Sequence, residues 1–82
     1  MSTKLHVGNI SSTVSEDDLK ATFARFGAVL GVEIARDSIT GTSKGYATVS
    51  MALDQDAVSA IQSMNFTTYG GRTIGVSRSR LA

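Results

Sequence analysis

The sequence of 82 residues contains no cysteine and only one histidine, His6. Without cysteine the chain cannot build a disulfide scaffold, a thiolate zinc site, a redox pair or a cysteine nucleophile. A single histidine also excludes a metal centre made of several histidines. We therefore expect no bound metal and no cofactor.

The chain also has little net charge and no long apolar run. Eight Lys and Arg residues against seven Asp and Glu residues give a net charge of +1. This charge is too small to indicate nucleic-acid binding by itself, so any basic surface has to come from clustering. No apolar run approaches the roughly 20 residues needed to span a bilayer, and the first residues lack the apolar stretch of a signal peptide. We expect an intracellular protein, in the cytoplasm, the nucleus or an organelle, that does not enter a membrane.

What the sequence does contain is the composition of a small folded domain. Hydrophobic residues make up 41% of the chain and charged residues 18%, which is typical of globular rather than disordered proteins. A chain of this length has room for one hydrophobic core, so we expect residues 1–82 to form a single domain. At roughly 0.05–0.15 kcal/mol per residue, its free energy of unfolding should be about 4–12 kcal/mol.

Four segments alternate between apolar and polar residues, which is typical of strands with one buried face. They are residues 4–8, 29–36, 44–51 and 72–78. In the third segment Ala47 and Val49 are expected to face the core, which turns Tyr46 and Thr48 to the opposite face. In the second segment the same alternation turns Glu33 away from the core.

The stretch between the first two strands predicts a helix. Ser15, followed by three acidic residues, forms a capping box that satisfies the free amides of a helix start. Leu19, Phe23 and Phe26 recur at helical spacing and form one apolar stripe. Gly27 stands where a glycine commonly ends a helix.

A second helix is expected between the third and fourth strands. It begins at Asp54 or Asp56, and it ends at Asn65, because asparagine tolerates the left-handed conformation that closes many helices. Residues 67–71 then form a loop that leads into the last strand. The buried stripe of this helix consists of Ala57, Ala60, Ile61 and Met64.

The element order β-α-β-β-α-β predicts a ferredoxin-like α+β sandwich. In this fold a four-stranded antiparallel sheet carries both helices on one face, and its other face is open. Right-handed crossovers place the first and third strands next to each other at the centre of the sheet. The outward side chains of these two strands should therefore lie side by side on the open face, namely His6, Tyr46, Thr48 and Ser50.

The predicted open face carries an aromatic side chain in its middle. Tyr46 is either a strand-forming residue that covers the sheet or a flat platform on which a nucleobase stacks. Gly45 beside it leaves backbone room for a ligand, and most acidic residues fall on the helices, which should separate charge between the two faces. Cations cluster around the strand and at the end of the chain, namely Lys44, Arg72, Arg78 and Arg80.

Two segments resemble the sequence motifs of RNA recognition motif domains. Residues 44–51 read KGYATVSM, which is similar to the family's octamer [KR]-G-[FY]-[GA]-[FY]-V-x-[FY]. Residues 5–10 read LHVGNI, which is similar to the family's hexamer in the first strand. The resemblance extends over nearly the whole chain. It implies the fold expected above and binding of single-stranded RNA on the open face.

The resemblance also implies which side chains stack on bases. In the family these are three aromatic residues, and they map to His6, Tyr46 and Thr48. An imidazole stacks more weakly than a six-membered ring and threonine cannot stack, so the resemblance implies weak binding, because one lost platform costs roughly 1–3 kcal/mol. Phe66 stands where the family usually has glycine, and we expect it to add packing.

The mechanism we expect is binding without catalysis. His6 and Tyr46 stack on neighbouring bases. The expected partner is single-stranded RNA, with single-stranded DNA as a second possible strand, and the chain is expected to be a monomer. Phosphates would be held by Lys44, Arg78 and Arg80. Hydrogen bonds to base edges or 2′-hydroxyl groups would come from Asn9, Thr48, Ser50 and Ser77.

Two other functions compete with this interpretation. A protein-interaction module on the same fold is favoured by Thr48, because a sheet face that binds protein does not need a third stacking ring. An acyl-phosphate hydrolase would need an arginine in an anion-binding loop, and residues 8–12 contain none. No carboxylate is placed to orient His6 in a catalytic triad. We therefore expect no enzymatic activity.

Overall fold

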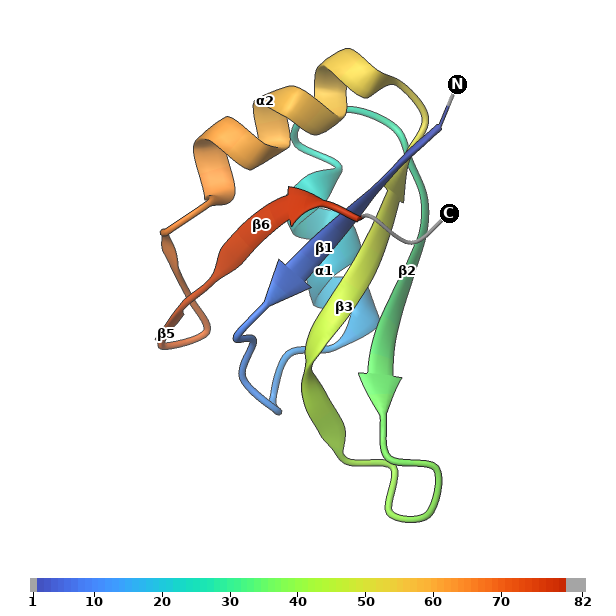
Figure 1. Ribbon diagram of the computed structural model, residues 1–82, viewed down its shortest axis with the longest axis vertical. Helices are drawn as coiled ribbons and strands as arrows, with labels where there is room; N and C mark the ends of the chain where they lie inside the picture. The colour runs from blue at the N-terminus through green and yellow to red at the C-terminus, as the bar shows by residue number, and fades with distance from the viewer. Residues whose placement is uncertain (1, 80–82) are drawn as a thin grey trace.

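The computed structural model describes residues 2–79 of the chain. The elements in chain order are β1 (Thr3–Gly8), α1 (Glu16–Phe23), β2 (Val29–Arg36), β3 (Ser43–Met51), α2 (Asp54–Met64), β4 (Thr68–Tyr69), β5 (Arg72–Thr73) and β6 (Gly75–Arg78) (Figure 1). Arg80, one of the cations expected to hold phosphate, lies outside the described residues. No helix within residues 2–79 is long and apolar enough to cross a membrane.

Four of the strands form an antiparallel sheet in the order β2-β3-β1-β6. β1 and β3 are therefore neighbours at its centre, as right-handed crossovers require. Both helices contribute to one core on the same side of the sheet, and in Figure 1 α1 lies behind the strands. Within residues 2–79 no helix covers the opposite face. The predicted ferredoxin-like α+β sandwich is confirmed.

The core lies between the sheet and the two helices. Leu5, Val7 and Val49 of the central strands are fully buried, and Leu19 and Phe23 of α1 are buried with them. Burial of a side chain of this size contributes about 1.5–3 kcal/mol. No polar or charged residue is buried among residues 2–79. The alternation in β1 and β3 thus separates a wholly apolar buried face from a polar exposed one.

Helix α1 begins as predicted but ends earlier. The Ser15 hydroxyl accepts a hydrogen bond from the Asp18 amide at 3.1 Å, and the Asp18 carboxylate accepts one from the Ser15 amide at 3.0 Å. The helix ends at Phe23, so Phe26 lies in the following turn, where it is half-buried and packs edge-on against Phe23. Gly27 does not end the helix. Glycine is needed there because a Cβ atom would lie 2.1 Å from the Asp56 carboxylate.

Helix α2 begins at Asp54 and ends before Asn65, but asparagine does not act there as predicted. Asn65 has an extended backbone, with φ −62° and ψ 132°. Its side-chain oxygen accepts a hydrogen bond from the Val76 amide at 2.9 Å. The left-handed residue is the next one, Phe66, with φ 63°. The expectation that Phe66 adds packing is wrong, because its side chain is 80% exposed.

The last strand is shorter than the predicted segment of residues 72–78. Arg72–Thr73 pairs with Thr68–Tyr69 in a separate hairpin, and only Gly75–Arg78 joins the main sheet. The strand is interrupted at Ile74, whose side chain is buried. The amide of Ile74 donates to the carbonyl of Thr67, and its carbonyl accepts from the Phe66 amide, both at 2.9 Å. These bonds hold Ile74 to the segment after α2, so it cannot extend the ladder with β1.

Candidate nucleic-acid interface

The face of the sheet without helices carries the polar side chains of the strands. His6 on β1 is paired with Thr48 on β3 and with Ser77 on β6, which places these residues in one row across the sheet. Glu33 on β2 extends the row, because it is paired with Thr48. The open face thus consists of Lys4, His6, Glu33, Tyr46, Thr48, Ser50 and Ser77.

Two rings lie side by side in this open face. The ring centroids of His6 and Tyr46 are 5.6 Å apart, and their planes are tilted by 32°. Tyr46 is 42% exposed, which confirms the expected presentation of this ring to solvent. The strand register pairs Tyr46 with Gly8, and a Cβ atom at Gly8 would lie 3.4 Å from Nε2 of His6. The imidazole therefore leans over Gly8 towards Tyr46, and together the rings form an aromatic platform.

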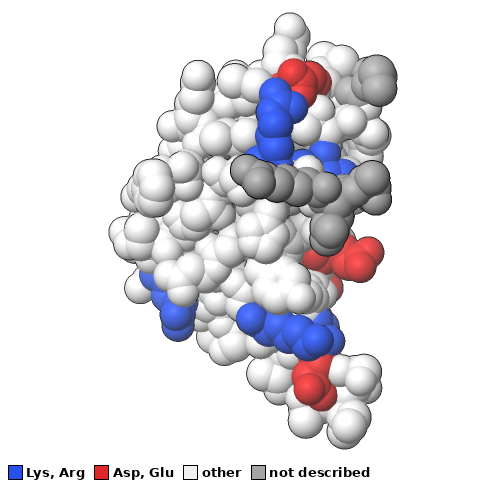
Figure 2. All heavy atoms as spheres, in the orientation of Figure 1, with Lys and Arg blue, Asp and Glu red and all other residues white. Residues whose placement is uncertain are grey.

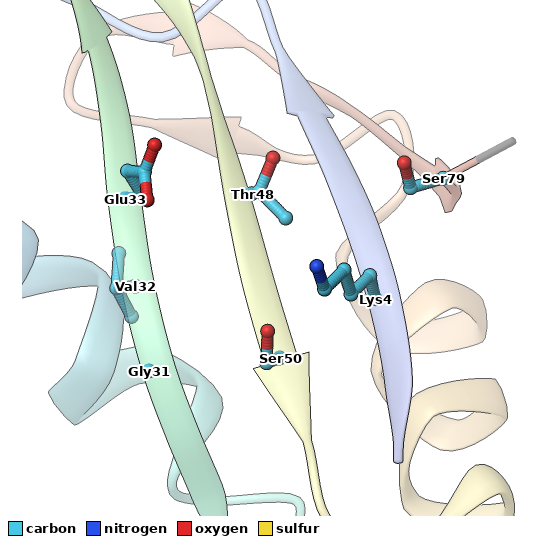
Figure 3. A pocket seen from close by; sticks show the side chains of 7 residues that line it. All are labelled: Lys4, Gly31, Val32, Glu33, Thr48, Ser50 and Ser79. Carbon is cyan, nitrogen blue, oxygen red and sulfur yellow. The ribbon is translucent and has the colours of Figure 1, made fainter. Parts of the chain in front are cut away.

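A hollow of about 320 Å³ lies beside this platform. Figure 3 shows that Thr48 and Ser50 of β3 lie between Glu33 on β2 and Lys4 on β1. Lys4 was not among the predicted site residues. Its alternation with His6 in β1 is the signal that would have found it, because residues two apart on a strand share a face.

A second hollow, of about 450 Å³, lies at the end of β1 and the beginning of β3. Two cations, Lys44 and Arg72, line it together with hydroxyl groups, and no acidic residue is among its lining side chains. Hydroxyl, amide and cationic side chains that converge in this way are suited to an anion such as phosphate. The lining consists of Asn9, Ile10, Ser12, Ser43, Lys44, Gly45 and Arg72.

Asn9 lies in this second hollow, but its side-chain amide already has partners. Its nitrogen donates to the Thr73 carbonyl at 2.7 Å, and its oxygen accepts from Nη2 of Arg72 at 2.7 Å. Asn9 has a left-handed backbone, with φ 62°, which asparagine tolerates better than most residues. Asn9 thus holds the guanidinium of Arg72 at the rim of the hollow.

Arg78 does not lie on the open face, where it was expected to hold a phosphate. It is paired with Leu5, whose side chain faces the core, so Arg78 points to the helix side of the sheet. There its guanidinium makes an ion pair with Asp54 at the start of α2, with Nη2 3.0 Å from Oδ2. Hydrogen bonds from Arg78 and then Thr3 lower the pKa of Asp54 to about 2. The open face therefore does not include Arg78.

The separation of charge between the two faces is weaker than predicted. Besides the Asp54–Arg78 pair, Glu16 of α1 is paired with Arg36 of β2 at 2.9 Å, and this hydrogen bond lowers the pKa of Glu16. Figure 2 shows Lys and Arg side chains at separate places on the visible part of this side, with Asp and Glu side chains among them. Aromatic and hydroxyl groups, rather than a continuous basic patch, therefore characterise this surface.

A family model for the RNA recognition motif matches residues 5–75. The chain belongs to the RNA recognition motif family. The putative RNA-binding protein RbpA of Synechocystis sp. is 34% identical to this RNA recognition motif domain over 76 residues, which are 93% of this chain and 75% of the relative. A chloroplastic RNA-binding protein of Arabidopsis thaliana is 35% identical over 74 residues, 90% of this chain and 22% of the relative.

Solved structures agree with this assignment. The crystal structure of RNA binding protein PG1 matches with a TM-score of 0.94 at 30% identity and covers 98% of this domain and 96% of that chain. An Sxl-lethal protein/RNA complex matches with a TM-score of 0.93 at 30% identity, over 100% of this domain and 49% of that chain. Some curated relatives are much longer: the domain spans 26% of an uncharacterized RNA-binding protein of Schizosaccharomyces pombe.

Proposed function

We propose that this domain binds single-stranded RNA on the open face of its sheet, without catalysis. The observation that carries the proposal is the exposed pair of rings, His6 and Tyr46, in the centre of a sheet face that no helix of residues 2–79 covers. Aromatic rings presented in this way stack on nucleobases, which is the usual way in which a sheet surface binds unpaired RNA. The relatives named as RNA-binding proteins support the proposal.

In this proposal each ring takes one base. The centroid distance of 5.6 Å shows that His6 and Tyr46 lie beside each other and are not stacked face to face. One base stacks on Tyr46 and its neighbour stacks on His6. Hydroxyl groups of Thr48, Ser50 and Ser77 flank the rings and bind the 2′-hydroxyl groups or base edges, which favours RNA over single-stranded DNA.

The phosphates are held at the second hollow in this proposal. Lys44 and Arg72 line it, and Asn9 fixes the guanidinium of Arg72 through hydrogen bonds. Arg72 takes the role that the sequence indicated for Arg78, because Arg78 is bound to Asp54 on the helix side. In this proposal the main role of Asn9 is to position Arg72, because its amide oxygen accepts from the guanidinium and its nitrogen donates to the Thr73 carbonyl.

Binding should be weak for a short strand. Thr48 stands in the row between Glu33 and His6 and offers a methyl and a hydroxyl group instead of a ring. Each stacked base is worth about 1–3 kcal/mol, so an interface with two rings binds about 5- to 150-fold more weakly than one with three. We propose a dissociation constant in the micromolar range or above.

The proposal is tested by substitution of Tyr46. Titration of a fluorescein-labelled pool of RNA heptamers, followed by fluorescence anisotropy, should show about 5- to 150-fold weaker binding for Tyr46→Ala than for the wild type. The control is Phe66→Ala, which removes an aromatic ring that is 80% exposed but lies in the turn after α2. If Tyr46→Ala and Phe66→Ala bind like the wild type, the aromatic platform does not bind RNA.

A protein-interaction module is the second candidate function. It is favoured by Thr48 in place of a ring and by exposed apolar side chains such as Leu30, at 63%, and Phe66. Small-angle scattering separates the two candidates. A compact dimer, together with no anisotropy change on addition of RNA, would favour protein binding, and a monomer that binds the heptamer pool would favour the RNA proposal.

A further inference from the structure

The hollow beside the platform has opposite chemistry on its two walls. Glu33 on β2 presents a carboxylate, which only accepts hydrogen bonds, and Lys4 on β1 presents an ammonium group, which only donates them. In Figure 3 the ammonium group of Lys4 points towards β3, and Glu33 lies on the far side of that strand. A ligand between the two walls therefore meets an acceptor on one side and a donor on the other.

Both charged groups are available to a ligand. Lys4 and Glu33 are exposed, and neither side chain makes a hydrogen bond or an ion pair with any other residue in the range 2–79. Glu33 differs in this respect from Glu16 and Asp54, whose carboxylates are bound to Arg36 and Arg78. Both groups can therefore bind a ligand in the hollow without first breaking an ion pair within residues 2–79.

The size of the hollow suits a planar ring. Its volume of about 320 Å³ is about ten times the share of one water molecule in the liquid, roughly 30 Å³. Thr48 and Ser50 form its floor with small side chains. A large ring at residue 48 would fill this space, so the loss of a stacking residue there is also what opens the hollow.

Building on the proposed function, we infer that this hollow reads the Watson–Crick edge of guanine. Guanine has two donors side by side, N1–H and the N2 amino group, which match the two oxygens of the Glu33 carboxylate. Its O6 acceptor lies at the corner between the Watson–Crick and Hoogsteen edges, so it can accept from the ammonium group of Lys4 on the opposite wall while the two donors face Glu33.

The other bases fit this pair of walls less well. Uracil presents one N–H donor between two carbonyl acceptors, so its oxygens would face the carboxylate of Glu33. Adenine and cytosine each present one amino group beside an acceptor nitrogen, so they make one hydrogen bond to Glu33 where guanine makes two. The hollow therefore favours guanine, while stacking on His6 and Tyr46 is independent of the base.

The test compares labelled RNA heptamers that differ in one central base. The wild type should bind UUUGUUU about 5- to 150-fold more tightly than UUUAUUU or UUUUUUU, which is the range expected for one good bidentate contact. Inosine, which lacks the N2 amino group, should give an intermediate affinity when it replaces the guanosine. Glu33→Gln should abolish the preference and should not weaken the binding of UUUUUUU, because it removes a negative charge from the binding face.

Two further variants separate base reading from simpler effects. Asp17→Asn removes an exposed carboxylate on α1, away from the open face, and should keep the guanine preference. Thr48→Phe should fill the hollow, so it should raise the affinity for all heptamers and lose the preference for guanine. A variant that failed to fold could not produce this gain in affinity.

The outcomes distinguish this inference from the proposed function. If the wild type binds all heptamers equally while Tyr46→Ala weakens every one of them, stacking stands and the reading of guanine is overturned. If Glu33→Gln strengthens all heptamers by the same factor and leaves the guanine preference intact, Glu33 acts only through its charge and the inference is overturned. If no heptamer binds, the proposed function fails and this inference fails with it.

Discussion

At the scale of single residues, Phe66 combines two costs. Its backbone is left-handed, with φ 63°, and its ring is 80% exposed. A left-handed conformation costs a residue with a Cβ atom roughly 1–2 kcal/mol, which glycine avoids. The chain accepts this cost because the Phe66 amide must reach the Ile74 carbonyl, 2.9 Å away, to close the turn after α2.

Phe66→Gly should therefore be more stable than Phe66→Ala. We expect its free energy of unfolding to exceed that of Phe66→Ala by about 1 kcal/mol, because both variants lose the ring and only glycine relieves the backbone. Urea denaturation followed by circular dichroism measures the difference. Equal stability of the two variants would show that the turn carries no strain at residue 66.

The direction of a side chain could be predicted from sequence more readily than its partners. Alternation along a strand turns Tyr46 away from Ala47 and Val49 whatever the rest of the chain does. The bonds of Asn9 to Arg72 and Thr73 join residues 63 and 64 positions apart, and no local pattern encodes them. The same holds for Arg78, whose partner Asp54 lies 24 positions away on α2.

At the scale of elements, the Asp54–Arg78 ion pair joins the start of α2 to the edge strand β6. The hydrogen bonds of Arg78 and Thr3 lower the pKa of Asp54 from 3.8 to about 2 in the folded protein. A lowered pKa in the folded state means that the pair stabilises the fold above the unfolded pKa. That contribution is lost as the pH falls from about 4 through about 2.

Asp54→Asn should reveal this pH dependence. The variant should be less stable than the wild type at pH 5, and the difference in the free energy of unfolding should shrink as the pH approaches 2. Urea denaturation at several pH values between 5 and 2 gives the comparison. Asp17→Asn, which removes an exposed carboxylate with no ion pair among residues 2–79, is the control. A difference that stays constant over this range would contradict the pH linkage of the ion pair.

Element boundaries were predictable where local signals decide them. The capping box at Ser15 is local, and α1 begins there. The last strand is different, because the alternation of apolar and polar residues continues through Ile74 but the strand is interrupted there. Hydrogen bonds from Ile74 to the turn after α2, and from Val76 to the side chain of Asn65, divide the segment into two strands. A pattern within the strand cannot show that a preceding turn takes its hydrogen bonds.

At the scale of the whole molecule, cations that are close in the sequence lie in different surroundings in the fold. Of the cations indicated near the last strand, Arg78 is neutralised by Asp54 and Arg72 is held by the amide of Asn9. Lys44 and Arg72 share one hollow without an acidic residue among its lining side chains, whereas Lys4 lies in the other hollow with Glu33. Phosphate contacts should therefore concentrate at one end of the sheet, where β3 begins.

This distribution predicts the salt dependence of RNA binding. For single-stranded nucleic acid, each neutralised phosphate contributes about −0.7 to the slope of log K against log salt concentration. Lys44→Gln and Arg72→Gln should each make the slope shallower by about 0.7, because each removes one contact. Arg78→Gln removes the same charge but should leave the slope unchanged, since its guanidinium is bound to Asp54 on the helix side. Anisotropy titrations of one RNA heptamer between 50 and 300 mM salt, roughly the range in which such slopes are measured, would test this. If the salt slope of Arg78→Gln becomes as shallow as that of Lys44→Gln, RNA reaches the edge strand and breaks the Asp54–Arg78 ion pair.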